Sequence, residues 1–182
     1  MPLTPHTRLA DKLKSEMRGI DNPRKAFDTF TKVLKTYLTE NTVLTYVWAA
    51  VSGNGSPDPV VTFKAEITIP GTLTQFPLER AGDSAFTLFK LQFETMLSTA
   101  LFKPPAGFAL TPAPFLLPSV IGGSMLNQGA LGALGGDWEA VMDEFARQIV
   151  ASVLNPAVWS RTPASGSHGG VYYGAAAGPV VT

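Results

Sequence analysis

Apolar residues recur with the spacing of an α-helix in four segments of this chain. In the first, Leu9, Leu13 and Met17 lie at i, i+4 and i+8, which predicts a helix over residues 7–18. The second starts at Asn22-Pro23, where the amide can cap the first turn and proline is tolerated. Its broad apolar stripe is made of Ala26, Phe27, Phe30, Val33, Leu34, Tyr37 and Leu38.

Two more amphipathic helices are predicted farther along the chain. One covers residues 83–102, with phenylalanines along one stripe and leucines beyond it, which is typical of a central helix or of one that contacts a neighbour. The other begins after the capping residue Asp137 and ends at Asn155-Pro156. Its apolar side is made of Trp138, Val141, Met142, Phe145, Ile149 and Val153.

A different pattern lies between the two pairs of helices. Residues 60–69 alternate between apolar and polar side chains, which predicts a half-buried strand. Residues 42–51 are apolar on both alternating faces, which predicts a buried strand, and the Gly- and Pro-rich residues 52–59 are typical of a turn. The predicted fold class is therefore α+β, with about four helices packed on a small antiparallel sheet formed by the hairpin 42–51/60–69.

No charged residue occurs between Pro104 and Gly136. Five prolines and seven glycines in this stretch exclude a regular membrane-spanning helix, because backbone groups left unpaired in lipid are very costly. In water, its apolar side chains must be covered by this domain or by another subunit. We therefore expect a long Pro/Gly-rich apolar loop that forms an interface through Phe108, Leu110, Phe115, Leu116, Leu117, Val120 and Ile121.

The C-terminal residues 161–182 are predicted to form an extended arm outside a single domain that spans residues 1–160. From residue 162 onward they contain no charged group apart from what His168 carries, and they have too few large side chains to build a core. Tyr172 and Tyr173 are expected to anchor this arm on a partner. A frayed tail is the alternative interpretation.

Charge and composition narrow the classes of function. Fourteen basic and fourteen acidic residues give zero formal net charge, so nucleic acid is not expected as a specific ligand. Charged residues make up 15% of the chain, below the ~25% typical of soluble domains, as expected where surface becomes interface. The absence of cysteine excludes disulfide and zinc-thiolate chemistry. No apolar run of signal-peptide length opens the chain, which indicates synthesis in the cytoplasm.

Catalytic, cofactor-binding and metal-binding residues are not predicted. The two histidines, His6 and His168, lie near opposite ends of the chain, and nothing in the spacing brings a carboxylate to either. The carboxylates between Asp137 and Glu144 fit the first turn and polar side of a helix better than an acid–base pair. The chain is therefore not expected to be an enzyme, and no cofactor is expected.

Four short segments are informative when they are read in order. They are Leu9-Ala10-Asp11-Lys12-Leu13-Lys14-Ser15-Glu16-Met17, Asp21-Asn22-Pro23, the strand end Trp48-Ala49-Ala50-Val51 and Gly166-Ser167-His168-Gly169. Across most of its length, the chain thereby resembles small structural proteins of contractile-tailed bacteriophages, which look like neck, tail or baseplate components. The resemblance implies a protein made in the host cytoplasm and incorporated in the virion, and it brings no catalytic residue.

The expected function is that of a structural subunit of a tailed-phage virion or a related injection machine. Its expected partners are further copies of itself, in a symmetric homo-oligomer, and neighbouring virion proteins. The alternative is a small-ligand, glycan or surface-binding module. Its pocket would form where the Pro-rich segment covers the hairpin, from Trp48, Phe108 and Phe115.

Overall fold

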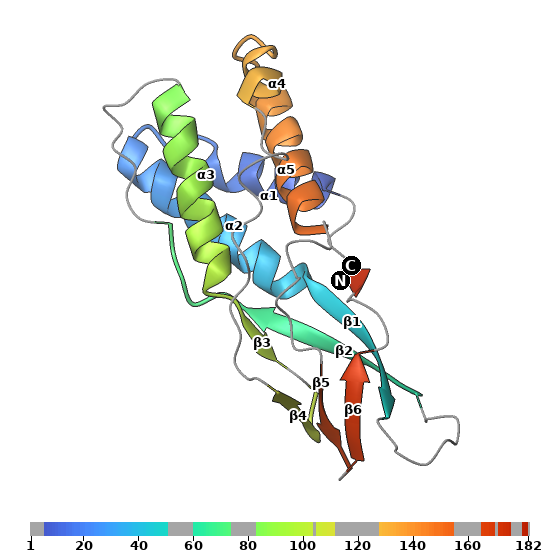
Figure 1. The fold of residues 1–182 in the computed structure, drawn as a ribbon. Coiled ribbons are helices and arrows are strands. Elements are labelled where there is room, and N and C mark those ends of the chain that lie inside the picture. The colour runs from blue at the N-terminus through green and yellow to red at the C-terminus, as the bar shows by residue number, and fades with distance from the viewer. Residues whose placement is uncertain are drawn as a thin grey trace.

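The computed structural model describes residues 6–50, 60–73, 83–103, 105–111, 128–154, 165–169, 171–175 and 180–181. Within these ranges the chain forms five helices and one seven-stranded antiparallel sheet, so the predicted α+β fold class is confirmed. The helices occupy one end of the molecule and most of the sheet the other (Figure 1). In the part of the chain described here, no helix is both long enough and apolar enough to cross a membrane.

The N-terminal helices form where the apolar spacing and the capping residues predict them. Helix α1 spans Thr7–Met17 and α2 spans Pro23–Asn41. The side chain of Asn22 accepts hydrogen bonds from the backbone N–H groups of Arg24 and Lys25, which caps the first turn of α2. Between the helices, Gly19 has φ +73°, a left-handed conformation that glycine adopts without steric cost.

The later helices follow the same pattern with two differences. Helix α3 spans Asp83–Ser98 and α5 spans Trp138–Leu154. The prediction for α3 ran too far, because Leu101–Lys103 leave the helix and pair with the sheet as strand β3. The short helix α4, Gln128–Gly132, was not predicted, since five residues carry too little periodicity to be recognised.

The predicted hairpin lies in the middle of the sheet. Strand β1, Val43–Ala50, pairs with β2, Val60–Thr68, in an antiparallel register that runs from Val43 opposite Glu66 to Ala49 opposite Val60. The half-buried pattern of β2 is present: Ile67 is buried, whereas its polar neighbours are exposed. Those exposed residues are Thr62, Lys64, Glu66 and Thr68.

The C-terminal segment has the extended backbone expected of an arm, but its described parts belong to this chain's own sheet. Strand β5, Ser165–His168, and strand β6, Val171–Ala175, pair with each other. Strand β6 also pairs with β1, as does the two-residue strand β7, Val180–Val181. The segment is thus joined to the domain by backbone hydrogen bonds on both sides of β6.

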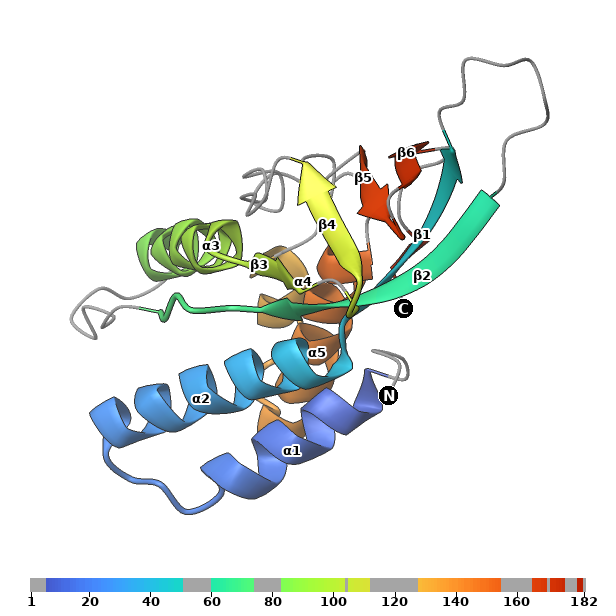
Figure 2. The ribbon, with the colours of Figure 1, turned by 90° about the horizontal axis from the view of Figure 1, so that it is seen from below.

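The order of the strands requires the sheet to coil. The order is β3-β2-β1-β6-β5-β4, where β4 is Phe108–Thr111, so β3 and β4 lie at opposite edges although only residues 104–107 separate them. In a flat sheet these edges would be about 24 Å apart, whereas the five steps from Lys103 to Phe108 span at most about 18 Å. The sheet must therefore curl until its edges approach, and Figure 2 shows β4, β5 and β6 turning away from β1 and β2.

The core lies where α2, α3 and α5 meet. Phe30 of α2 contacts Phe89 of α3 and Phe145 of α5, with ring centroids 6.0 and 5.3 Å apart. Phe89 in turn stacks on the fully buried Phe93. From α1, Leu9, Ala10 and Leu13 are also fully buried. One apolar core therefore joins the four long helices, and Leu44, Ile67 and Tyr173 of the sheet belong to it.

Candidate interaction surfaces

The structure separates the two tyrosines that the sequence placed together in the interface. Tyr172 is 50% exposed, whereas Tyr173 is 8% exposed and belongs to the core. Successive side chains of a strand point to opposite faces, so adjacent tyrosines cannot both face the same surroundings. Only Tyr172 is therefore available to a partner, and the role assigned to Tyr173 is corrected to core packing.

The exposed tyrosine belongs to the end of a hairpin formed by β5 and β6, described at residues 167–169, 171 and 172. Beside Tyr172, Val171 is also exposed, and both pair with β5, opposite Ser167 and His168. The described register of β6 with β1 begins only at Tyr173, opposite Ala50. The end of β5 and the start of β6 lie at the end of the molecule farthest from α4 (Figure 1). We call the described residues 167–169, 171 and 172 the hairpin tip.

Phe108, another predicted interface residue, is engaged within the chain. Its ring stacks on the His168 imidazole, with centroids 4.1 Å apart and planes inclined by 17°. His168 Nδ1 lies 3.1 Å from the Gly107 carbonyl oxygen. Because a carbonyl only accepts hydrogen bonds, Nδ1 carries the proton and donates it. Phe108 and His168 thus hold the start of β4 against the end of β5, so the Phe108 ring already has a contact within the chain.

Of the remaining predicted interface residues, the structure describes only the backbone of Leu110. Leu110 is placed by its backbone in β4, opposite Gly166. Phe115, Leu116, Leu117, Val120 and Ile121 lie outside the described residues. The same holds for Phe115 in the pocket expected for a ligand-binding module, and the interface expected from the uncharged stretch stays a prediction.

A second surface, which the sequence analysis did not identify, is a hollow between the end of α1 and the start of α5. It has a volume of about 390 Å³. Its apolar lining comes from Met17, Ile20, Ala26 and Trp138, and its charged lining from Lys14, Arg18, Asp21 and Glu139, with Gly19 between. We call it the Trp138 hollow, because the indole is 42% exposed there.

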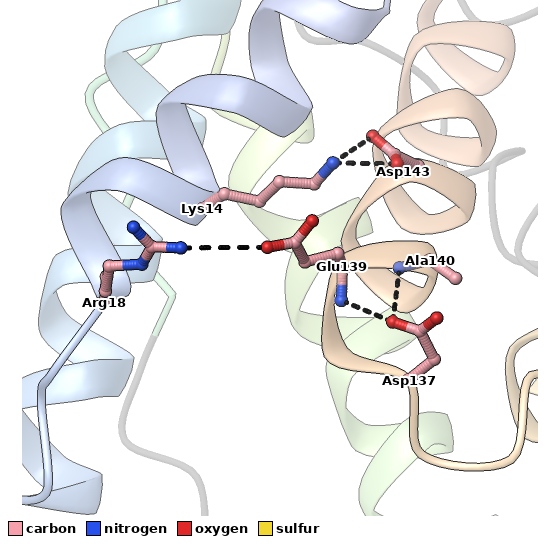
Figure 3. A network of polar contacts seen from close by, with 6 residues as sticks. All are labelled: Lys14, Arg18, Asp137, Glu139, Ala140 and Asp143. Carbon is pink, nitrogen blue, oxygen red and sulfur yellow. Dashed lines mark hydrogen bonds and ion pairs between the residues drawn. The ribbon is translucent and has the colours of Figure 1, made fainter.

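Trp138 is exposed because of its position in α5. The sequence analysis placed it at the head of the apolar stripe and therefore on the buried side. A helical side chain covers the turn that precedes it, and the first residue of a helix has no preceding turn. Asp137 caps this helix end by accepting hydrogen bonds from the N–H groups of Glu139 and Ala140 (Figure 3). The capping residue Asp137 was therefore the signal in the sequence that Trp138 lies at the start of the helix, where no preceding turn covers it.

Ion pairs connect the end of α1 to the start of α5 beside the hollow (Figure 3). Lys14 Nζ donates to both carboxylate oxygens of Asp143, at 2.8 and 2.7 Å, and this bonding raises the pKa of Lys14. Arg18 lies 3.8 Å from Glu139, and its side chain is 83% exposed. An exposed pair at that distance contributes little to stability. Arg18 can therefore turn to a different acceptor at small cost.

The polar face of α5 carries a stronger pair that makes the stability of the fold depend on pH. Arg147 donates two hydrogen bonds to the carboxylate of Glu144, and Gln148 donates a third. Bonding to Arg147 is the main reason why the pKa of Glu144 falls to about 2. A pKa lowered by folding stabilises the protein above the unfolded pKa, near 4.3, and this contribution is lost as the pH falls toward 2.

We expect Glu144→Gln to lower the free energy of unfolding by about 1 kcal/mol at pH 7, a modest value because the pair is partly exposed. The difference from the wild type should shrink between pH 4.5 and pH 2, as measured by urea unfolding at several pH values. Arg147→Met is the matched control, because it removes the cause of the shift. The double variant should lose no more than either single variant, and a difference that persists at pH 2 would contradict this account.

The described residues form no evident metal centre, and known proteins provide no further guide. In the described ranges, no group of three or more His, Cys, Asp or Glu side chains is arranged to hold a metal ion. Comparisons with protein-family models, with curated proteins and with solved structures found no match. Interpretation of function therefore depends on the two surfaces, the hairpin tip and the Trp138 hollow.

Proposed function

We propose that this protein is a structural subunit of a tailed-phage virion or a related injection machine, in the neck, tail or baseplate region, and acts by packing against other subunits. The observation that carries the proposal is the hairpin tip, which exposes Val171 and Tyr172 on opposite faces of β6. An exposed tyrosine on a rigid strand is a typical anchor of protein interfaces, because its ring buries a large area with little loss of conformational entropy. The partners in this proposal are further copies of the chain and neighbouring virion proteins.

The composition of the hairpin tip supports this proposal. Residues 165–175 contain no Asp, Glu, Lys or Arg, and the cores of interfaces are depleted in charged residues. The backbone of the tip is tied to the domain by β5 and β6, so little order remains to be gained on binding. A preorganised and partly apolar hairpin end without Asp, Glu, Lys or Arg is suited to permanent contact with a neighbour.

The proposal is tested by measuring the size of the purified protein. Sedimentation velocity at micromolar concentration, alone and after co-expression with the products of adjacent genes, should show assemblies larger than one chain. Tyr172→Ser should weaken this assembly at least tenfold, while Leu91→Ser should leave it unchanged, because Leu91 is a 58% exposed residue on a different element. A protein that stays monomeric both alone and with its neighbours would contradict the proposed function.

One observation favours a second candidate function, a small-ligand or glycan-binding module. The Trp138 hollow has the volume of a ligand site and combines an exposed indole with charged groups of both signs. This function predicts a stable monomer whose tryptophan fluorescence changes saturably with a sugar or another small ligand. Trp138→Ala should abolish that change, and assembly without any such binding would exclude it.

A further inference from the structure

The two surfaces lie far apart on the molecule. The start of α5 is at the end occupied by α4, whereas the end of β5 and the start of β6 are at the opposite end (Figure 1). A single chain therefore cannot fill its own hollow with its own tip. Two copies placed end to end can do so, and the tip of one then meets the hollow of the next.

The exposed apolar residues point to such a pairing. Four large hydrophobic residues are exposed in the described part of the chain: Leu91, Trp138, Val171 and Tyr172. Three of these four belong to the hollow or to the tip. A contact between a tip and a hollow would cover Trp138 of one copy and Tyr172 of the other, whereas contact between two like surfaces would leave the other kind uncovered in both copies.

The size and polarity of the two surfaces also match. A cavity of about 150 Å³ accommodates a benzene ring, so a hollow of about 390 Å³ has room for the tyrosine ring. The apolar lining suits the ring, and the weakly paired Arg18 and Glu139 at the same hollow suit a phenol that both donates and accepts a hydrogen bond. The tip contains no Asp, Glu, Lys or Arg that would repel either one.

We infer that the Trp138 hollow receives the hairpin tip of a second copy of this chain, with Tyr172 as the inserted side chain. The contact is head-to-tail, because the two surfaces are different. Such contacts close into a ring if the rotation between copies permits, and otherwise they continue as a filament. The inference rests on the proposed function and names the contact through which the subunit assembles with itself.

Cross-linking can test this contact without background, because the chain has no cysteine of its own. Asp21→Cys marks the hollow and Val171→Cys marks the tip, which leaves Tyr172 in place. With a short bis-maleimide at micromolar concentration, the chain carrying both substitutions should give a ladder of oligomers or a closed ring. A mixture of the two single variants should stop at a dimer that contains one chain of each kind.

The control replaces the hollow position with Leu91→Cys, which is exposed but belongs to neither surface. We expect at least tenfold less cross-linked product from Leu91→Cys with Val171→Cys than from Asp21→Cys with Val171→Cys. Adding Tyr172→Ser should lower the Asp21–Val171 product by at least tenfold. Circular dichroism of each variant checks that it is folded.

Four results would overturn the inference. Efficient cross-linking of either single variant with itself would show that like surfaces meet, and equal yields with Leu91→Cys would show non-specific contact. If the wild type assembles but the chain with Asp21→Cys and Val171→Cys gives no cross-linked product, the contact lies elsewhere and the proposed function stands. A wild type that never assembles, alone or with its neighbours, would instead contradict both.

Discussion

Removing residues 162–182 is expected to prevent cooperative folding. The deletion takes away β5, β6 and β7, so β4 loses its partner and β1 loses the pairing along one side. It also removes Tyr173 from the core, and loss of a buried aromatic side chain alone costs about 3–5 kcal/mol. Since a domain of this size has a total stability of about 5–15 kcal/mol, the remainder is too small for a stable fold.

Urea unfolding followed by circular dichroism measures this effect. The deleted chain should show either no cooperative transition or a midpoint far below that of the full chain. Two single substitutions accompany the deletion. Tyr173→Ala should destabilise the protein by about 3 kcal/mol, and its matched control, Tyr172→Ala, by less than about 0.5 kcal/mol. A deleted chain with the wild-type midpoint would restore the expectation of an arm outside the domain.

Phe93→Ala is expected to destabilise the protein by about 3–5 kcal/mol. Phe93 is fully buried in α3 and stacks on Phe89, which contacts Phe145 of α5. The substitution removes a ring from the point where helices from both halves of the sequence meet. The surrounding residues belong to several elements, so they cannot all close on the cavity, and the penalty is near the upper part of the range.

The control for Phe93→Ala lies two residues away on the same helix. Leu91 is exposed, so Leu91→Ala should change the free energy of unfolding by less than about 0.5 kcal/mol, while the helical propensity stays almost the same. Both variants are compared by urea unfolding at pH 7. Equal effects of the two substitutions would mean that α3 is not packed as the structure shows.

The helices and the central hairpin were predictable because their signals are local. Leu9, Leu13 and Met17 share one face because they lie on successive turns of the helix, and Asn22 caps a helix that starts at the next residue. The hairpin of β1 and β2 joins neighbouring segments through a Gly- and Pro-rich loop. In each case, residues that contact one another lie within a short stretch of sequence.

The pairing of the C-terminal strands could not be predicted in this way. Ala175 pairs with Trp48, and Ser165 pairs with Thr111, across long separations in sequence. A segment such as Gly166-Ser167-His168 has weak intrinsic strand propensity, so its conformation depends on the partner strand. An extended backbone was the correct expectation, but whether it pairs with its own sheet or with another chain is a property of the complete fold.

The candidate surfaces likewise depend partly on local sequence and partly on the complete fold. Local pattern placed Tyr172 in an interface and Trp138 on a helix, because composition and periodicity depend on neighbours along the chain. The separation of Tyr172 from the buried Tyr173, and the hollow around Trp138, depend on segments that approach only after folding. Burial is a sum of contacts from distant parts of the chain, and such a sum exists only once the helices and the coiled sheet have come together.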